Sequence, residues 1–148
     1  MKRGQKQKGF TIVELLIVVV VIGILAAISI VAYGTVQQRA KVSRANADLA
    51  TLNKAIQAAR VNQGRTLMQI TGSNCSHCIG AATTNASIDA IAAASGTNLS
   101  SLKQGDPWGN IYRIDENEGE NGNCNPDGLG VSPGQAGVSV ILVPTFAC

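Results

Sequence analysis

One short segment of this chain brings together residue types that do chemistry, Cys75-Ser76-His77-Cys78. Two thiols beside the chain's single histidine are consistent with a redox dithiol, with half of a zinc site or with a local disulfide. A redox role needs a helix start in a βαβ context, which the sequence does not indicate. Zinc needs two more ligands, for which Cys124 and Cys148 lack close spacing. A disulfide is favoured if this part of the chain lies outside the cytoplasm.

A second polar segment, residues 115–123, holds four carboxylates and three amides within nine residues. Oxygen ligands of this kind, together with backbone carbonyls, are those that calcium takes, so Asp115 and Glu118 are candidate ligands. The spacing is not that of an EF-hand. A solvated hairpin tip is the alternative interpretation, and the residues alone leave both open.

Catalysis and nucleic-acid binding find little support in the composition. The single histidine, the lack of a nucleophile and base pair and the lack of a phosphate-cradling glycine pattern predict that the chain is not an enzyme. The net charge is +3, but the four basic residues before Gly9 account for it, since residues 10–148 hold 8 Lys and Arg against 9 Asp and Glu. Basic residues after Arg44 are scattered, so no nucleic-acid partner is expected.

The element that must position these groups is the apolar segment from Leu15 to Tyr33, which contains no charged residue. It is long enough to cross a bilayer as one helix, and it is apolar on all sides, so it needs lipid or other helices around it. The basic residues before it keep the N-terminus cytoplasmic and place the rest of the chain across the membrane. Glu14, at the edge of this segment, is costly there and therefore indicates a partner or a function.

The run Lys8-Gly9-Phe10-Thr11-Ile12-Val13-Glu14-Leu15-Leu16 resembles the class III signal of type IV pilins and type II secretion pseudopilins. The resemblance implies cleavage by a prepilin peptidase between Gly9 and Phe10, methylation of the new N-terminus at Phe10, and an assembly role for Glu14. An ordinary secretory signal is cut after its apolar region instead.

The same resemblance implies a structural subunit of a pilus or pseudopilus-like filament. Its partners would be further copies of the chain, the peptidase, an inner-membrane assembly platform and, before assembly, membrane lipid. It would be a single-pass membrane protein with an extracytoplasmic head, and then part of an extracellular or periplasmic filament. The alternative is a membrane-anchored extracytoplasmic binding module that does not polymerise.

A second motif, Asp106-Pro107-Trp108-Gly109-Asn110-Ile111-Tyr112, resembles the Asp-Pro-Trp-Gly-Asn-Pro-Tyr signature of major pseudopilins, with one departure. Pro107 and Gly109 suit a turn and Trp108 can anchor a small core, so we interpret the motif, Asp106 included, as structural. Pseudopilins bind calcium in the loop that follows, and this resemblance adds Asp127 to the candidate calcium ligands Asp115 and Glu118.

The four cysteines allow three pairings. We predict Cys75 with Cys78 and Cys124 with Cys148, and the second pair resembles the C-terminal disulfide loop of many type IV pilins. Such a bridge would hold the chain end onto a head that has only a small core.

The expected fold is α+β and pilin-like, with a long N-terminal transmembrane and amphipathic helix packed on a small antiparallel sheet. Spacings of three and four residues in 35–63 predict an amphipathic helix that packs against the head rather than forming a coiled coil, and Gly64 ends it. Further expected elements are a loop over 66–74, a short helix near 86–95 ended by Gly96, and strands at 111–114 and 137–143. The domains are a leader (1–9), a membrane or filament-core half-helix (10–34), an amphipathic half-helix (35–63) and a head (64–148). The apolar stripe consists of Val42, Ala45, Leu49, Leu52, Ile56 and Ala59.

Overall fold

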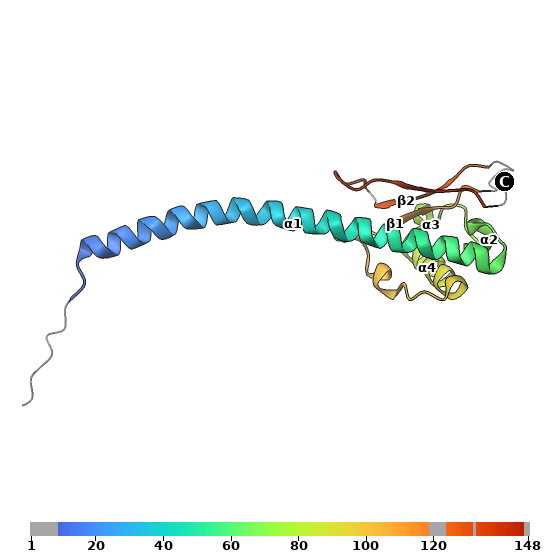
Figure 1. Cartoon of the computed structure of the whole chain (residues 1–148), viewed down its shortest axis with the longest axis horizontal. Coiled ribbons are helices and arrows are strands. Elements are labelled where there is room, and N and C mark those ends of the chain that lie inside the picture. The colour runs from blue at the N-terminus through green and yellow to red at the C-terminus, as the bar shows by residue number, and fades with distance from the viewer. Residues whose placement is uncertain (1–8, 119–123, 132, 147–148) are drawn as a thin grey trace, which may run out of the picture. The chain divides into compact units, whose positions relative to one another are not determined.

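The structure, a computed structural model, describes residues 9–118, 124–131 and 133–146 (Figure 1). These residues form two compact units that divide between Arg39 and Ala40, within one long N-terminal helix. Among the described residues, every buried side chain belongs to the second unit.

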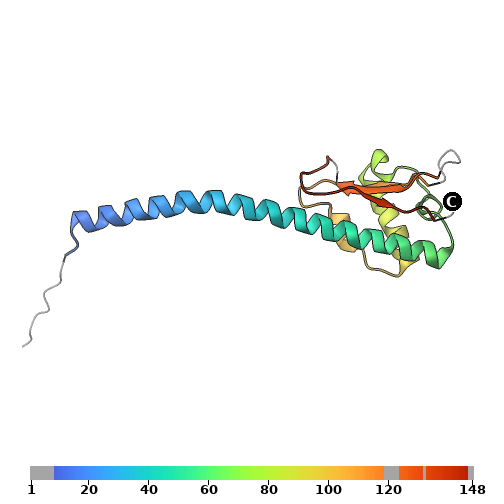
Figure 2. The ribbon, with the colours of Figure 1, turned by 45° about the horizontal axis from the view of Figure 1, so that its top comes forward.

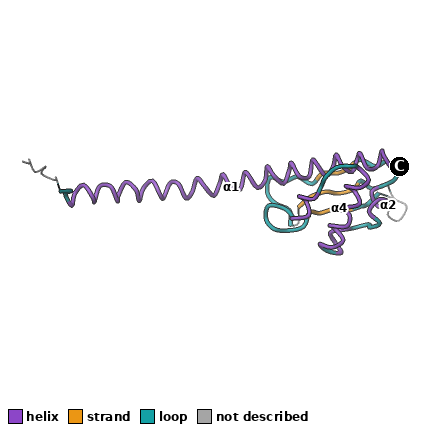
Figure 3. Tube along the Cα trace, turned by 90° about the horizontal axis from the view of Figure 1, so that it is seen from below, coloured by secondary structure: helices purple, strands orange, loops and turns teal. Residues whose placement is uncertain are grey.

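The long helix, α1, runs from Ile12 to Gln63 without a break, and Figure 3 shows it as one helical trace. It ends where Gly64 takes a left-handed φ of 63° and donates its backbone N–H to the carbonyl of Arg60 at 2.7 Å. A residue without a Cβ adopts this conformation at little cost. The predicted helix end at Gly64 is confirmed.

The part of α1 inside the second unit has one buried face. The predicted apolar stripe has six residues. Val42, at its start, is half-buried, and the other five are buried. They pack against side chains from the rest of the head, so the prediction of head packing is confirmed. The strands lie beside this part of α1 (Figure 2).

The expectation of a loop over 66–74 is wrong in part, because α2 (Leu67–Thr71) lies within it. Thr66 and Gln69 form a capping box: the Thr66 hydroxyl accepts from the backbone of Gln69 at 3.4 Å, and the Gln69 side chain accepts from the backbone of Thr66 at 3.1 Å. This Thr-x-x-Gln signature is the signal that sequence reasoning overlooked.

Three further helical elements follow α2: α3 (Ser76–Ile79), α4 (Ala81–Ser95) and the 3₁₀ helix η1 (Ser100–Gln104). The helix predicted near 86–95 is α4, which begins at Ala81 because its first turns are rich in alanine and need no large apolar residue to form. It ends as predicted at Gly96, whose φ is 73°.

The sheet has three antiparallel strands in the order β1-β2-β3, which are β1 (Tyr112–Asp115), β2 (Asp127–Val131) and β3 (Ile141–Val143). The register pairs Ile114 with Leu129 and Leu129 with Ile141. The predicted strand over 137–143 is therefore shorter than expected. The central strand was not predicted, because its sequence contains Gly128 and Gly130, which weaken the strand pattern.

One hydrophobic core joins the second half of α1, α2, α4 and the inner face of the sheet. Alternate strand residues point into it, among them Tyr112, Ile114, Leu129 and Val143. The fold is therefore the expected α+β arrangement of a long helix on a small antiparallel sheet.

Candidate functional site

The start of α1 is held by its own side chains. The Glu14 carboxylate accepts hydrogen bonds from the backbone N–H and the hydroxyl of Thr11, each at 2.8 Å, and the backbone N–H of Glu14 donates to the Thr11 hydroxyl at 3.2 Å. This reciprocal pair is a capping box, which satisfies donors that the first turn of a helix leaves free. Glu14, the predicted assembly residue, thus also has a local role that the sequence analysis did not assign.

The predicted processing site, Gly9-Phe10, lies just before this cap. Both residues are exposed, and the Phe10 side chain is 83% exposed. Cleavage between these residues and methylation of Phe10 stay predictions.

The apolar half of α1 has no cover from the rest of the described chain. The described leucine, isoleucine and valine side chains of this half are exposed on all sides of the helix, with Leu16 58% and Ile28 63% exposed. Over part of its length this helix is long and apolar enough to cross a membrane, by length and composition. Apolar surface of this extent requires lipid or other helices around it.

Cys75 and Cys78 form a disulfide, as predicted. His77, between them, places its Nδ1 3.1 Å from the carbonyl oxygen of Ile114 in β1 and 3.3 Å from the sulfur of Cys75. Among the described residues these three form the one cluster with metal-ligand chemistry and spacing. The bridge ties up both thiols, and zinc binds thiolates, so the disulfide interpretation is the one that fits this geometry.

Cys124 is also disulfide-bonded. Cys148, the partner that we predict for it, lies outside the described residues.

The predicted structural motif forms a self-contained turn after η1. Asp106 accepts hydrogen bonds from the backbone N–H groups of Trp108 and Asn110, both at 2.9 Å, and its own N–H donates to the carbonyl of Asn110 at 2.7 Å. Trp108 packs against the core. The buried ring of Tyr112 ends in a hydroxyl that donates to Asp48 of α1 at 2.5 Å, so the motif fastens β1 to the helix.

A buried ion-pair cluster joins the end of α1 to the sheet. The guanidinium of Arg60, only 2% exposed, contacts the carboxylates of Asp127 and of Glu118, the latter at 2.9 Å, and donates to the carbonyl of Pro144. Both carboxylates are fully buried. Burial raises the pKa of Asp127, while the Glu118 N–H and the Arg60 charge favour its ionised form.

The predicted calcium ligands make other contacts in this arrangement. Asp115 pairs with Arg113 at 2.8 Å. The other two share Arg60, and their remaining oxygens accept backbone N–H groups, Glu118 from Phe146 at 2.6 Å and Asp127 from Glu118 at 2.8 Å. Calcium binding at these residues stays a prediction, since residues 119–123 of the same loop lie outside the described residues.

Sequence reasoning missed Arg60, although one signal was available. Arg60 follows Ile56 by four residues, which puts it on the buried face of the amphipathic helix. A charged residue on that face requires a buried partner of opposite charge.

A further buried carboxylate, Glu116, was likewise missed as a residue of interest in its own right. Its Oε2 accepts the backbone N–H of Ser76 at 2.9 Å and its Oε1 accepts the Ser76 hydroxyl, which also contacts the hydroxyl of Ser87 at 2.5 Å. Burial raises the pKa of Glu116, and the hydrogen bonds from Ser76 partly offset that effect.

Comparison with known proteins points to the N-terminal region. The family model of the prokaryotic N-terminal methylation motif matches residues 4–30. A fimbrial protein of Pseudomonas aeruginosa is 49% identical over 53 residues, which cover 36% of this chain and 34% of that protein. The type IV major fimbrial protein FimA of Dichelobacter nodosus is 42% identical over 71 residues, which cover 46% of each chain. The type IV major alpha-pilin of Moraxella bovis is 45% identical over 53 residues, which cover 36% of this chain and 33% of that protein.

The chain thus spans less than half the length of these relatives. No solved structure matches it significantly. The methylation motif coincides with the Gly9-Phe10 site and with the start of the exposed apolar helix, and the relatives are fimbrial proteins. On these grounds the N-terminal region of the chain is similar to that of type IV pilins.

Proposed function

We propose that this protein is the structural subunit of a type IV pilus-like filament, without catalytic activity. The observation that carries the proposal is the apolar half of α1, which is exposed on every side and lies largely within the match to the methylation motif. A helix of this kind can rest in lipid and then move into a bundle of identical helices, because both surroundings cover all of its sides. The fimbrial relatives favour a pilus over a secretion pseudopilus.

In this proposal a prepilin peptidase cuts between Gly9 and Phe10 and methylates the new amine. The head is extracytoplasmic, the subunit leaves the membrane through an inner-membrane assembly platform, and the filament consists of copies of this chain. The disulfide between Cys75 and Cys78 supports an extracytoplasmic head, because such bonds persist in oxidising compartments.

Glu14 would pair with the N-terminal amine of a neighbouring subunit. In a helical bundle of low dielectric an unpaired carboxylate is costly, so this pair would fix the register between neighbours. In the single chain Glu14 caps its own helix through Thr11, so the cap and the intersubunit pair draw on the same carboxylate.

Three variants separate the cap from the pair. Glu14→Gln keeps an oxygen that can accept from Thr11 but removes the charge, whereas Thr11→Ala removes the hydroxyl of the cap but keeps the charge. We expect Glu14→Gln and Glu14→Ala to abolish filaments seen by electron microscopy, and Thr11→Ala to assemble. Normal filaments from Glu14→Ala would contradict the intersubunit pair. Loss of filaments in Thr11→Ala, but not in the two Glu14 variants, would show that the helix cap matters and the charge of Glu14 does not.

The identity of the mature N-terminal residue distinguishes the filament subunit from the alternative function, an anchored binding module that does not polymerise. Mass spectrometry of the mature protein should find methylated Phe10 as the first residue in all three variants, because the cleavage site precedes the substitutions. A mature chain that retains residues before Phe10 would favour the anchored module.

A further inference from the structure

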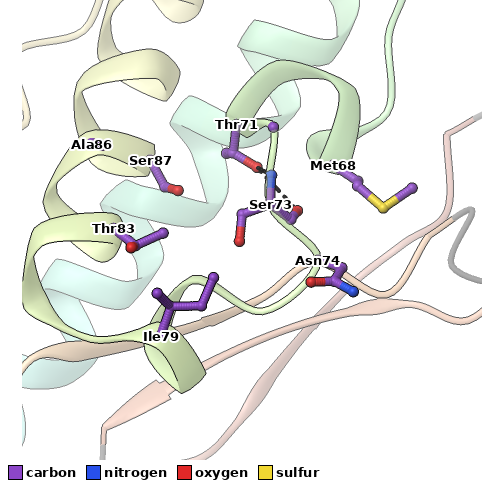
Figure 4. A pocket seen from close by; sticks show the side chains of 9 residues that line it. Met68, Thr71, Ser73, Asn74, Ile79, Thr83, Ala86 and Ser87 are labelled. Carbon is purple, nitrogen blue, oxygen red and sulfur yellow. Dashed lines mark hydrogen bonds between the residues drawn. The ribbon is translucent and has the colours of Figure 1, made fainter.

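A pocket of about 330 Å³ opens in the head between α2, α3 and α4 (Figure 4). Its volume lies near the lower end of the range for small-molecule sites, roughly 300–1000 Å³. The lining is a mixture of hydroxyl groups with short apolar patches. It consists of Met68, Thr71, Gly72, Ser73, Asn74, Ile79, Thr83, Ala86 and Ser87.

One of these hydroxyls has no partner. Ser73 is 9% exposed, and its Oγ is buried and makes no hydrogen bond to any described residue. Figure 4 shows this side chain directed into the pocket, facing Ser87 and Thr83. A buried hydroxyl without a partner is unfavourable, and a group bound in the pocket would remove that cost.

The wall opposite Ser73 can both donate and accept hydrogen bonds. Ser87, 1% exposed, contacts the Ser76 hydroxyl at 2.5 Å, and Ser76 in turn contacts the buried carboxyl of Glu116. Each of these serine hydroxyls carries one proton. If Ser76 donates its proton to Glu116, Ser76 must accept a hydrogen bond from Ser87, and the Ser87 oxygen can then accept a hydrogen bond from a ligand in the pocket. With a proton on Glu116 the chain of donors can run in the other direction. A ligand hydroxyl suits both cases because it donates and accepts.

The residues that line the pocket do not suit an anionic ligand. None of the residues that line it is a lysine, arginine or histidine, and the nearest ionisable group in the hydrogen-bonded wall is the carboxyl of Glu116. Phosphate, sulfate and carboxylate ligands need cationic side chains or several converging N–H donors. Met68, Ile79 and Ala86 add short apolar surfaces that suit the carbon atoms of a small ring.

We propose that this pocket binds a neutral, polyhydroxylated ligand of monosaccharide size, held by the hydroxyls of Ser73, Ser87 and Thr83. The inference stands on the head alone and does not depend on filament assembly.

The test uses the full chain in a detergent without a sugar headgroup. Saturation-transfer NMR with D-glucose, D-galactose and N-acetyl-D-glucosamine, each at millimolar concentration, should detect binding of at least one of them, and inorganic phosphate should leave the sugar signal unchanged. Loss of one hydrogen bond in Ser73→Ala should weaken binding about fivefold to tenfold. Ala86→Leu, which fills the pocket from an exposed position of α4, should abolish it.

Thr84→Val is the matched control. Thr84 is 1% exposed and its hydroxyl is also buried without a partner, but it does not line the pocket. Its removal should leave sugar binding unchanged, and thermal melts should show both Ser73→Ala and Thr84→Val folded, since neither substitution removes a side-chain hydrogen bond to a described residue. The absence of transfer to all three sugars would overturn the proposal. Transfer that persists in Ser73→Ala and Ala86→Leu would overturn it as well.

Discussion

Buried carboxylates in the head differ in what balances their charge. Glu118 and Asp127 share the guanidinium of Arg60, whereas Glu116 is held by hydroxyl and N–H donors of Ser76. A cation compensates for lost hydration of a carboxylate more fully than neutral donors do. The two settings therefore predict different responses to substitution and to pH.

Removal of Arg60 should leave two buried carboxylates close together without a cation. We expect Arg60→Met to lower the free energy of unfolding by roughly 3–5 kcal/mol in urea titrations near neutral pH. The loss should shrink as pH falls, because burial raises the pKa of Asp127 and its protonation removes the repulsion between the two carboxylates.

Lys103→Met provides the control for Arg60. Lys103 pairs with Asp89 at 2.8 Å, but both side chains are well exposed, so its loss should change the free energy of unfolding by less than about 1 kcal/mol. Equal effects of the two substitutions would contradict the special role of the buried cluster. A calcium-dependent rise in the melting temperature of the wild-type chain would contradict the assignment of Arg60 as the cation of this cluster.

Glu116 should make the folded state less stable as pH rises. Its pKa lies above the ordinary value of 4.5, so the folded chain holds this proton more tightly than the unfolded chain does. The contribution to stability is then fully present below about pH 4 and is lost as pH rises through the raised pKa. Glu116→Gln should therefore raise the melting temperature at about pH 8 and change it little at about pH 4.

Calorimetry of both proteins across this pH range measures the difference. Asp89→Asn, at an exposed carboxyl, controls for the loss of one charge and should show no comparable dependence. A Glu116→Gln variant that is less stable than wild type at about pH 8 would show that the hydroxyl contacts of Glu116 outweigh the cost of its burial.

At the scale of elements, the turn after η1 depends on a glycine outside the recognised motif. Gly105 has a φ of 89°, and a Cβ added there would lie 2.7 Å from the carbonyl oxygen of Asn110. That oxygen accepts the N–H of Asp106, so the backbone on both sides of the turn is in close contact. Gly109 has a similar φ of 87°, but a Cβ there would meet no atom within 4 Å.

The two glycines make a matched pair of substitutions. Gly105→Ala should lower the free energy of unfolding by about 2–4 kcal/mol, because it adds a backbone clash to the strain of a positive φ. Gly109→Ala should cost about 1 kcal/mol, from the strain alone. Urea unfolding of both variants measures the difference, and equal losses would show that the close approach at Gly105 relaxes freely.

The pattern of correct and incorrect predictions follows from which forces act locally. The long helix, its end at Gly64, the buried stripe and the bridge between Cys75 and Cys78 were predicted, because periodicity, a left-handed glycine and close spacing are local signals. Strand β2 was missed because its glycines are acceptable only where neighbouring strands cover them, which is a tertiary effect. The partners of Arg60 come from positions 118, 127 and 144, which no local pattern connects.

At the scale of the whole molecule, the two halves of α1 serve different surroundings. The apolar half is exposed along its length, whereas the first fully buried residue among those described is Ala45. The division of the chain at Arg39 and Ala40 therefore coincides with the change from a surface that needs outside partners to one that the head itself covers. Stability of the head should then be independent of the first unit.

A truncation series tests this independence. A chain that begins at Arg39 should be soluble and should melt within a few degrees of the full chain in detergent, because it keeps every described core residue. A chain that begins at Asn53 lacks Ala45, Leu49 and Leu52 and should not fold, since loss of three buried residues from a small core exceeds the margin of stability of a domain of this size. Circular dichroism melts distinguish the outcomes. An unfolded chain from Arg39 onward would show that the apolar half of α1 contributes to the fold of the head, and the two units would then unfold as one cooperative unit.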